Sequence, residues 1–342
     1  MSEFVTLDEI RAAQRRIAGA AVRTAVYRVS RARLRMAGVA EPEFDLYIKA
    51  ESEQPIGSFK LRGAYNMVAQ LSPEALGRGV ITYSSGNHAQ GVAYAARALG
   101  AKAVIVMPGN APAVKKEATA ALGAEIVEVG PSSSERRMKA EELAEKFGYA
   151  IIPPYDNVAI IAGQGTCGLE IVEQVPGVDL VIAPVSGGGL LSGVATAVKL
   201  SAPEVQVWGA EPELAADAKE SFETKRLVEW EASRTTQTMG DGLRTQSLGA
   251  LNFEHVLKYV DGIVAVSEEE ILAAMRVMLE ATKLVPEPSG AVALAAALYH
   301  AAELPKVRKV VAVMSGGNLE PELLGKLRSE PTGGKADKPD NP

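Results

Sequence analysis

Lys60 is the side chain in this sequence best placed to act as a nucleophile or a base. It follows a Pro-Ile-Gly turn signal and Phe59, and it precedes a helical stretch at 61–71. A lysine amine does such chemistry only when it can lose its proton near neutral pH, and partial burial beside an aromatic ring promotes that loss. Most lysines are simply solvated, but the setting of Lys60 favours a role in chemistry.

A second group of polar residues, Ser84-Ser85-Gly86-Asn87-His88, lies between a β-type run and an Ala-rich helical stretch. Ligands bind at such junctions in open α/β sheets, beyond the carboxyl ends of the strands. A helix cap alone would need only one of these side chains. The motif therefore predicts a binding loop.

Three consecutive glycines, Gly187 to Gly189, follow Ser186 and precede a helical stretch that begins near Leu190. Glycines let backbone N–H groups converge on an anion at a helix N-terminus, which contributes on the order of 0.3–1 kcal/mol per charge. The loop has neither the GxGxxG nor the Walker pattern, so the phosphate belongs to something smaller than a dinucleotide or a nucleoside triphosphate. A structural turn is the alternative, but a turn seldom needs three glycines.

The elements that must position these residues are Val- and Ile-rich runs that alternate with Ala-rich helical stretches. This pattern predicts an α/β fold with buried, mostly parallel strands. The runs are 80–84, 102–107, 179–185, 205–210 and 309–314. Ser315 follows the last run, so we expect it to enter the same crevice as the two loops unless it is an ordinary turn serine.

Two domains are expected, with the smaller inserted into the larger, because no Gly-Pro linker divides the chain. Residues 1–79 and 156–328 would form the large domain, and residues 80–155 the small one. The segment 329–342 is rich in Pro, Gly and charge, which predicts a disordered tail.

Composition narrows the class of protein. The 342 residues include 36 basic and 42 acidic side chains, a formal charge of -6, so the surface is not suited to nucleic acid. Cys167 is the only cysteine, as expected in a reducing compartment. We find neither a signal peptide nor an apolar run long enough to span a bilayer. The prediction is a cytoplasmic protein without a membrane partner.

Four motifs together, GSFKLRGA, SSGNHAQGVA, SGGGLLSG and MSGGN, resemble the fold-type II pyridoxal-phosphate enzymes. Within them the chain resembles the threonine/serine dehydratase and serine racemase group over roughly residues 5–325. The resemblance implies a fold like the tryptophan synthase β-chain: two open, mostly parallel sheets flanked by helices, with pyridoxal 5'-phosphate in a cleft between the large and the small domain.

The resemblance also implies a role for each motif. Lys60 would carry the cofactor, Phe59 would pack near its ring, and Asn87 would bond the ring oxygen. The phosphate would lie on the backbone of Ser186, Gly187, Gly188, Gly189 and Leu190, and Ser315 would meet the pyridine nitrogen. A hydroxyl there does not hold that nitrogen protonated, which makes the ring a weaker electron sink and favours prompt loss of a β-hydroxyl over transamination.

The implied reaction is dehydration and deamination of L-threonine or L-serine to a 2-oxo acid and ammonia, with Lys60 taking the α-proton. The substrate carboxylate would meet Ser84, Asn87 and His88, with Thr245 nearby. Two further classes stay open: β-replacement of the cysteine synthase kind, and a silent cofactor-binding protein on the same fold. Leu61 after the lysine and His88 after Asn87 favour elimination over β-replacement.

Ser85 indicates a second activity, racemisation. Many plain dehydratases of the group have alanine at this position, whereas serine racemases have serine, which can handle a proton on the face opposite Lys60. Racemisation is therefore the alternative function. Arg136 matches an arginine of racemase-like members that could accept a second carboxylate, such as that of 3-hydroxyaspartate, although an exposed helix arginine is the more common interpretation.

Glu211, Ala215 and Asp217 resemble the divalent-cation site of serine racemases, where two carboxylates and a carbonyl suit Mg²⁺ or Ca²⁺. A solvated acidic loop is the alternative. The group also implies a homodimer, and no C-terminal regulatory domain is expected after the MSGGN motif.

Overall fold

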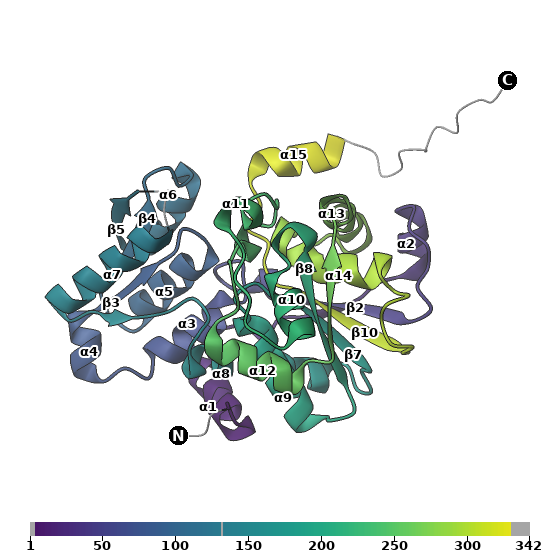
Figure 1. Ribbon diagram of the computed structural model, residues 1–342, viewed down its shortest axis with the longest axis horizontal. Coiled ribbons are helices and arrows are strands. Elements are labelled where there is room, and N and C mark those ends of the chain that lie inside the picture. The colour runs from purple at the N-terminus through teal and green to yellow at the C-terminus, as the bar shows by residue number, and fades with distance from the viewer. Residues whose placement is uncertain (1–3, 131–132, 330–342) are drawn as a thin grey trace.

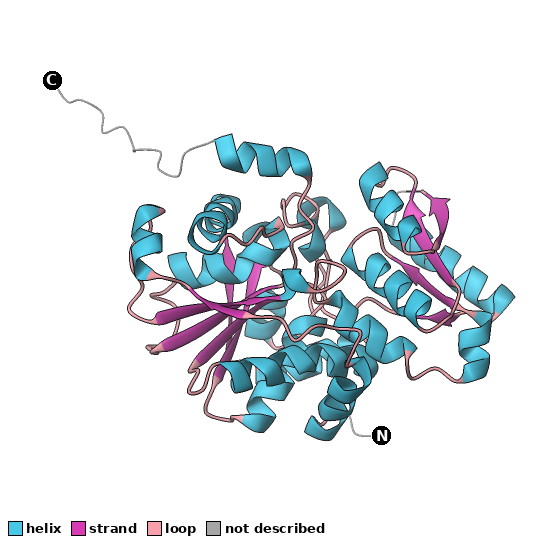
Figure 2. Ribbon diagram, turned by 180° about the vertical axis from the view of Figure 1, so that it is seen from behind, coloured by secondary structure: helices cyan, strands magenta, loops and turns pink. Residues whose placement is uncertain are grey.

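The computed structural model describes residues 4–130 and 133–329 and contains two sheets flanked by helices (Figures 1 and 2). The six-stranded sheet has the order β1-β2-β10-β7-β8-β9, and the four-stranded sheet has the order β5-β4-β3-β6. Only β1 pairs antiparallel with its neighbour. The predicted α/β fold with two mostly parallel sheets is thus confirmed.

The larger sheet joins strands from both ends of the chain. Its members are β1 (Val26–Arg28), β2 (Asp45–Ala50), β10 (Lys309–Met314), β7 (Leu180–Pro184), β8 (Gln206–Pro212) and β9 (Gly262–Val266). The smaller sheet consists of β5 (Glu125–Val129), β4 (Ala103–Pro108), β3 (Val80–Tyr83) and β6 (Ala150–Ile151). The five predicted runs are β3, β4, β7, β8 and β10, and the other five strands were not predicted.

Helices cover both faces of the larger sheet. One face packs on α2 (Arg31–Met36), α13 (Glu268–Thr282), α14 (Pro288–Tyr299) and α15 (Pro321–Ser329). The other packs on α8 (Val158–Gln174), α9 (Gly189–Ser201), α10 (Asp217–Thr224) and α12 (Ala250–Tyr259). In β10, Val310 and Ala312 enter the first core and Val311 and Val313 the second. Burial on both faces explains why this strand is apolar after Lys309.

The smaller sheet has its own helices, which Figure 1 shows to the left of the larger sheet. They are α5 (Asn87–Ala98), α6 (Ala113–Ala121) and α7 (Ser133–Phe147). The strands lie inside the range 80–155 that we propose as the small domain. Helix α4 (Pro73–Arg78) precedes that range and yet contacts the small sheet region, since Arg78 Nε donates to the Gly148 carbonyl at 2.9 Å.

The remaining elements are short or link the two sheets. They are α1 (Leu7–Ile17), α3 (Lys60–Val68), α11 (Ala232–Thr235) and three 3₁₀ turns, η1 (Glu51–Glu53), η2 (Glu213–Ala215) and η3 (Asp241–Leu243). Ser329 is the last residue of α15, and the rest of the predicted tail lies outside the described residues. None of the described helices has both the length and the apolar content needed to cross a bilayer.

Helix α3 packs closely against α8, and this contact fixes the position of Lys60, the first residue of α3. A Cβ on Gly163 would lie 2.6 Å from the Cα of Gly63, so only glycine permits this crossing. Beside it, the buried Arg62 guanidinium bonds Glu51 at 2.7 Å and Glu170 at 2.7 Å. An ion pair that is fully buried is costly unless every partner is satisfied, and here the geometry satisfies it.

Candidate active site

The amine of Lys60, at the start of α3, contacts the segment that follows β6. Its Nζ donates to the Pro154 carbonyl at 2.8 Å and lies 5.1 Å from the centre of the Phe59 ring. Burial lowers the pKa of Lys60 to about 8. The amine can therefore lose its proton near neutral pH, which is the property that a nucleophilic or basic lysine needs.

The loop before Lys60 is paired with the loop after β10. The Phe59 N–H donates to the Ser315 carbonyl at 3.0 Å, and the Gly317 N–H donates to the Gly57 carbonyl at 2.9 Å. Strands β2 and β10 are neighbours, so the segments that follow them leave the same edge of the sheet. Ser315 is buried and its Oγ donates to the Ser289 carbonyl at 3.4 Å.

Asn87 begins α5 and connects the two sheets. Its Nδ2 donates to Glu287 Oε1 at 2.7 Å, and its Oδ1 accepts from Asn318 Nδ2 at 2.7 Å. An amide nitrogen has two N–H bonds, so one donor of Asn87 remains for a ligand.

His88 is buried and stays neutral. Burial and the nearby charge of Lys60 lower its pKa to about 3. Its Nε2 lies 3.0 Å from the Ile152 carbonyl, which is an acceptor, so Nε2 carries the proton. The other ring nitrogen is then an acceptor and cannot bind a carboxylate. The predicted substrate contact at His88 is thus restricted to its backbone N–H, at the start of α5.

The glycine loop leads into the N-terminus of α9. Ser186 and Gly188 both have positive φ, 58° and 92°, and α9 begins at Gly189. The first N–H groups of a helix have no partner within it, so those of Gly189 and Leu190 are available to an anion. A Cβ on Gly187 would lie 2.5 Å from the ring of Tyr155. The loop is therefore closed on one side by this tyrosine.

Two neighbours support the glycine loop. Asn252 Nδ2 donates to the Gly187 carbonyl at 2.9 Å, and the hydroxyls of Ser186 and Thr245 lie 3.0 Å apart. Thr245 is thus placed beside the predicted phosphate site.

The predicted metal ligands lie together near the same loop. Glu211 is buried in β8, and Asp217 begins α10, with Ala215 buried between them. Glu211 Oε1 and both carboxylate oxygens of Asp217 lack a hydrogen-bond partner. Burial raises the pKa of both carboxyls, that of Asp217 to about 7. Such a pair fits a proton or a cation. Within 4–130 and 133–329 no group of three or more His, Cys, Asp or Glu side chains is arranged for a metal.

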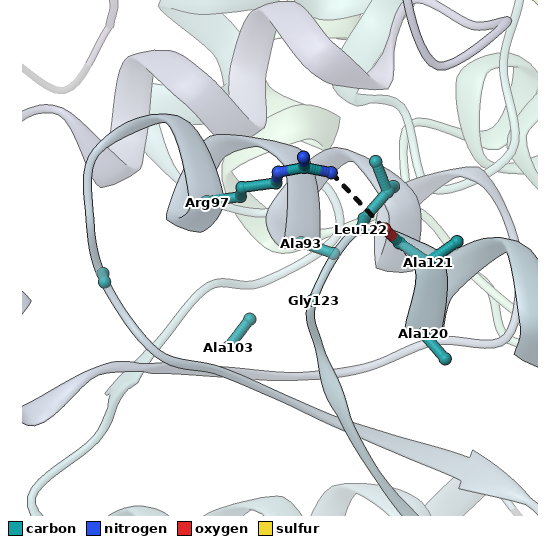
Figure 3. Close-up of a pocket in the computed structure, with 8 residues that line it drawn as sticks. Ala93, Arg97, Ala103, Ala120, Ala121, Leu122 and Gly123 are labelled. Atoms are coloured by element: carbon teal, nitrogen blue, oxygen red, sulfur yellow. Dashed lines mark hydrogen bonds between the residues drawn. The ribbon is translucent and has the colours of Figure 1, made fainter.

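Ser85 is half-buried in the loop between β3 and α5, next to Ser84, whose Oγ accepts from the Gly86 N–H at 3.3 Å. Arg136 is half-buried in α7, and burial lowers its pKa. A hollow of about 350 Å³ lies elsewhere, between α5 and α6, where Arg97 bonds the Ala121 carbonyl (Figure 3). None of the predicted site residues lines it.

Known proteins resemble this chain over most of its length. The family described as "Pyridoxal-phosphate dependent enzyme" matches residues 22–316. The chain belongs to that family. An L-threonine ammonia-lyase of Thermotoga maritima is 42% identical over 95% of this chain and 78% of its own. A serine racemase of Schizosaccharomyces pombe is 38% identical over 95% of this chain and 98% of its own.

A solved structure described as a T.th. threonine deaminase superposes with a TM-score of 0.84. It is 45% identical and covers 92% of this chain and 99% of its own. The fold is therefore that of the fold-type II pyridoxal-phosphate enzymes, as the sequence motifs predicted. The resemblance to the threonine/serine dehydratase and serine racemase group is confirmed as well.

The described residues fit the family's cofactor. Lys60 offers an amine that can be neutral, the glycine loop offers helix N–H groups for a phosphate, and Asn87 keeps one N–H for a ring oxygen. The aldehyde, the ring oxygen and the phosphate are different substituents of the pyridoxal ring. Three groups from three different segments of the chain can therefore each contact one of them.

Two residues of the site were missed by sequence reasoning. Glu287 contacts Asn87 directly, and Tyr155 covers the glycine loop. Neither stands in a glycine-rich motif, so no local pattern marks them. The Glu-Pro-Ser-Gly sequence at 287–290 would have suggested a turn with an acidic residue before a helix, but not its direction.

Proposed function

We propose that this protein is a pyridoxal-phosphate-dependent ammonia-lyase that acts on L-threonine and L-serine. The proposed products are 2-oxobutanoate and pyruvate, each with ammonia. The observation that supports this most is the partly buried Lys60, whose amine lies 2.8 Å from the Pro154 carbonyl and whose pKa burial lowers to about 8. The relatives named threonine ammonia-lyase and threonine deaminase support the substrate class.

When bound, pyridoxal phosphate supplies an electron sink for the electron pair left on the substrate α-carbon. In the proposed arrangement the first N–H groups of α5 hold the substrate carboxylate, and Ser84 keeps that loop in shape through Gly86. Lys60 takes the α-proton, because its buried amine is neutral in an appreciable fraction near pH 8. The β-hydroxyl takes up a proton and leaves as water, and the released enamine tautomerises and then reacts with water to give the 2-oxo acid and ammonia.

The neutral state of His88 has a consequence for this reaction. Its Nε2 proton is bound to the Ile152 carbonyl, so the imidazole does not serve as the acid for the departing hydroxyl. A cationic histidine beside Lys60 would also lower the amine's pKa further and make it a poorer base. The proposed role of His88 is thus to keep the region around Lys60 uncharged.

Racemisation of serine is the second proposed activity, and Ser85 is the observation that favours it. The residue lies in the substrate loop, and the serine racemase relative supports the comparison. Arg136, half-buried in α7, is the proposed contact for a second carboxylate such as that of 3-hydroxyaspartate.

The remaining proposals concern the setting of the enzyme. Glu211, Asp217 and the Ala215 carbonyl are proposed to bind Mg²⁺ or Ca²⁺, supported by three carboxylate oxygens without a partner. We further propose a homodimer and a cytoplasmic location, the latter supported by a single, buried cysteine. The proposed small domain, 80–155, is supported by the separate four-stranded sheet.

A 2-oxo acid assay over L-threonine, L-serine and 3-hydroxyaspartate tests the function. We expect product from at least one of the first two, and none after Lys60→Ala. Lys102→Ala is the matched control, since this lysine is exposed and bonds Glu125 and Tyr149 on the small sheet. Full activity in the Lys60 variant, or no product from any of the three amino acids with cofactor bound, would contradict the proposal.

A further inference from the structure

Glu287 is a buried carboxyl group at the edge of the site. The residue precedes α14 as its N-cap, yet its side chain makes no cap hydrogen bond. Only 6% of the residue is exposed, and Oε1 lies 2.7 Å from Asn87 Nδ2. Burial of the charged form of a carboxyl group is costly. Because this one does not cap the helix, we expect its burial to serve another contact.

The loop after β10 makes room for this carboxyl group. The Glu287 N–H donates to the Gly316 carbonyl at 3.2 Å, and a Cβ on Gly316 would lie 2.2 Å from Glu287 Oε1. Any residue larger than glycine at 316 would push the carboxyl group away from Asn87. The glycine after Ser315 therefore serves the contact between Glu287 and Asn87.

The contact fixes the direction of the Asn87 amide. Asn318 Nδ2 donates to Asn87 Oδ1, so that atom is the oxygen, and Glu287 accepts from the nitrogen side. The amide cannot turn over without losing both bonds. Its second N–H is then held in one direction.

The charge on Glu287 is sensitive to pH. Burial, followed by the negative charge of Asp241 in η3, raises its pKa to about 7. Three contacts act in the opposite direction: the Asn87 hydrogen bond, the positive charge of Lys115 in α6, and the Asn318 backbone N–H. Lys115 itself is 2.6 Å from Asp241 and 3.8 Å from Glu320. The carboxyl group thus changes its ionisation across neutral pH.

We propose that Glu287 is a positioning residue for the cofactor: it fixes the Asn87 amide that meets the ring oxygen, and its charge state sets how tightly the cofactor binds. The inference rests on the proposed function, in which Asn87 contacts that oxygen. A bound cofactor brings its anionic ring oxygen near Glu287, and that charge opposes the ionised carboxylate. Binding therefore weakens as Glu287 loses its proton.

The test is cofactor affinity, measured by titrating the apoprotein with pyridoxal phosphate at pH 6 and pH 8. Glu287→Gln keeps an oxygen acceptor for Asn87 but cannot ionise. We expect it to match the wild type at pH 6 and to bind about three- to tenfold more tightly at pH 8, a difference of up to about 1.4 kcal/mol. Taking the ratio of the two proteins at each pH removes the contribution of Lys60, which both share.

Two more variants separate the length of the residue 287 side chain from its charge. Glu287→Asp still ionises but is too short to hold Asn87, so its affinity should fall about tenfold at both pH values. Glu320→Gln is the matched control, because it removes an exposed carboxylate near Lys115 without a contact to Asn87. It should bind as the wild type does.

A second measurement needs no cofactor. Because the pKa of Glu287 is raised by folding, its contribution to stability is full below its unfolded pKa and is lost as pH rises through about 7. Glu287→Gln should therefore gain about 3 °C in Tm over the wild type between pH 5 and pH 8. A Gln-to-wild-type affinity ratio that does not change with pH, or an aspartate variant with wild-type affinity, would overturn the inference. Failure of wild-type protein to bind the cofactor would instead reject the proposed function.

Discussion

At the scale of single residues, the sequence predicts chemical type well and partners poorly. Lys60 was expected to be partly buried beside Phe59, and the structure shows a partly buried lysine whose amine lies near that ring. The carbonyl that accepts its hydrogen bond, that of Pro154, is 94 residues away along the chain and follows the small sheet. Nothing near Lys60 in the sequence indicates it.

His88 illustrates the same limit. Its position after Asn87 suggested a substrate ligand, but the protonation of its ring depends on the Ile152 carbonyl and on the charge of Lys60. Both are set by how the sheet and α3 pack, so a motif alone cannot give the direction of its donors.

Ser85 carries the prediction that separates the two proposed activities. Elimination requires the α-proton to leave only toward Lys60, whereas racemisation also requires an acid on the opposite face. Loss of a general acid typically costs about 10²- to 10⁴-fold in rate. We expect Ser85→Ala to abolish conversion of L-serine to D-serine and to leave 2-oxo acid formation largely intact. Chiral chromatography and a 2-oxo acid assay on the same samples measure both.

The neighbouring serine provides the control for that experiment. Ser84 Oγ accepts from the Gly86 N–H, so Ser84→Ala should disturb the loop and reduce both activities together. If Ser85→Ala also reduces both activities to the same degree, the hydroxyl either takes part in both reactions or has a structural role. The proposal that Lys60 and Ser85 act on opposite faces of the substrate is then wrong.

At the scale of elements, the strands that end at the site were predictable because they are buried on both faces and hence apolar throughout. β7 and β10 are largely of this kind, and β3 has a buried Val-Ile start followed by Thr82 and Tyr83; the loops that follow these three strands are the predicted motifs. β1 and β5 are short or partly exposed, with burial that does not alternate regularly, so they gave no clear pattern. Helix α4 is only six residues long, so its sequence does not indicate which sheet it contacts.

The glycine loop yields a prediction at this scale. Gly188 has φ 92°, and a Cβ there would lie 2.8 Å from Asn252 Cβ and 2.8 Å from Leu248 Cδ2. Gly188→Val should therefore displace the loop that holds the phosphate and lower cofactor affinity by about tenfold or more, roughly 1.4 kcal/mol. Absorbance titration of the purified protein with pyridoxal phosphate measures this.

Backbone strain alone must be separated from loss of the phosphate site. Gly100→Val is suited to this, because Gly100 also has positive φ, 70°, but a Cβ there meets nothing within 4 Å. Both variants should lose about 1–3 kcal/mol of stability from strain. Only the Gly188 variant should lose cofactor, and full occupancy in that variant would mean that the phosphate binds elsewhere.

At the scale of the whole molecule, the site exists because loops from two sheets meet. Lys60, the glycine loop and Ser315 leave the larger sheet, while Asn87 and His88 leave the smaller one. The motif order predicted this arrangement through family resemblance, since apolar periodicity does not say which sheets face each other. The contacts that join the sheets, Asn87 with Glu287 and Lys115 with Asp241, could be found only in the folded structure.

The buried carboxylates of Glu211 and Asp217 bear on the stability of the whole chain. Three of their oxygens have no partner, and placing two unpaired negative charges in the interior is costly. A divalent ion that binds only the folded protein would offset that cost, by about 2.7 kcal/mol at a hundredfold excess over its Kd. We expect Mg²⁺ or Ca²⁺ to raise the Tm by roughly 5 °C, and a chelator to reverse the change.

Asp217→Asn decides whether that response comes from this site. The amide keeps the shape of the side chain but removes its charge, so the Tm should no longer depend on the metal, while the metal-free variant should be at least as stable as the metal-free wild type. Glu213→Gln is the matched control, because it removes one charge from the same segment, η2, where the side chain is exposed. That variant should keep the full response. A metal-dependent Tm that survives Asp217→Asn, measured by differential scanning calorimetry in parallel with the control, would show that the ion binds elsewhere and that the two carboxyls are neutralised by protons instead.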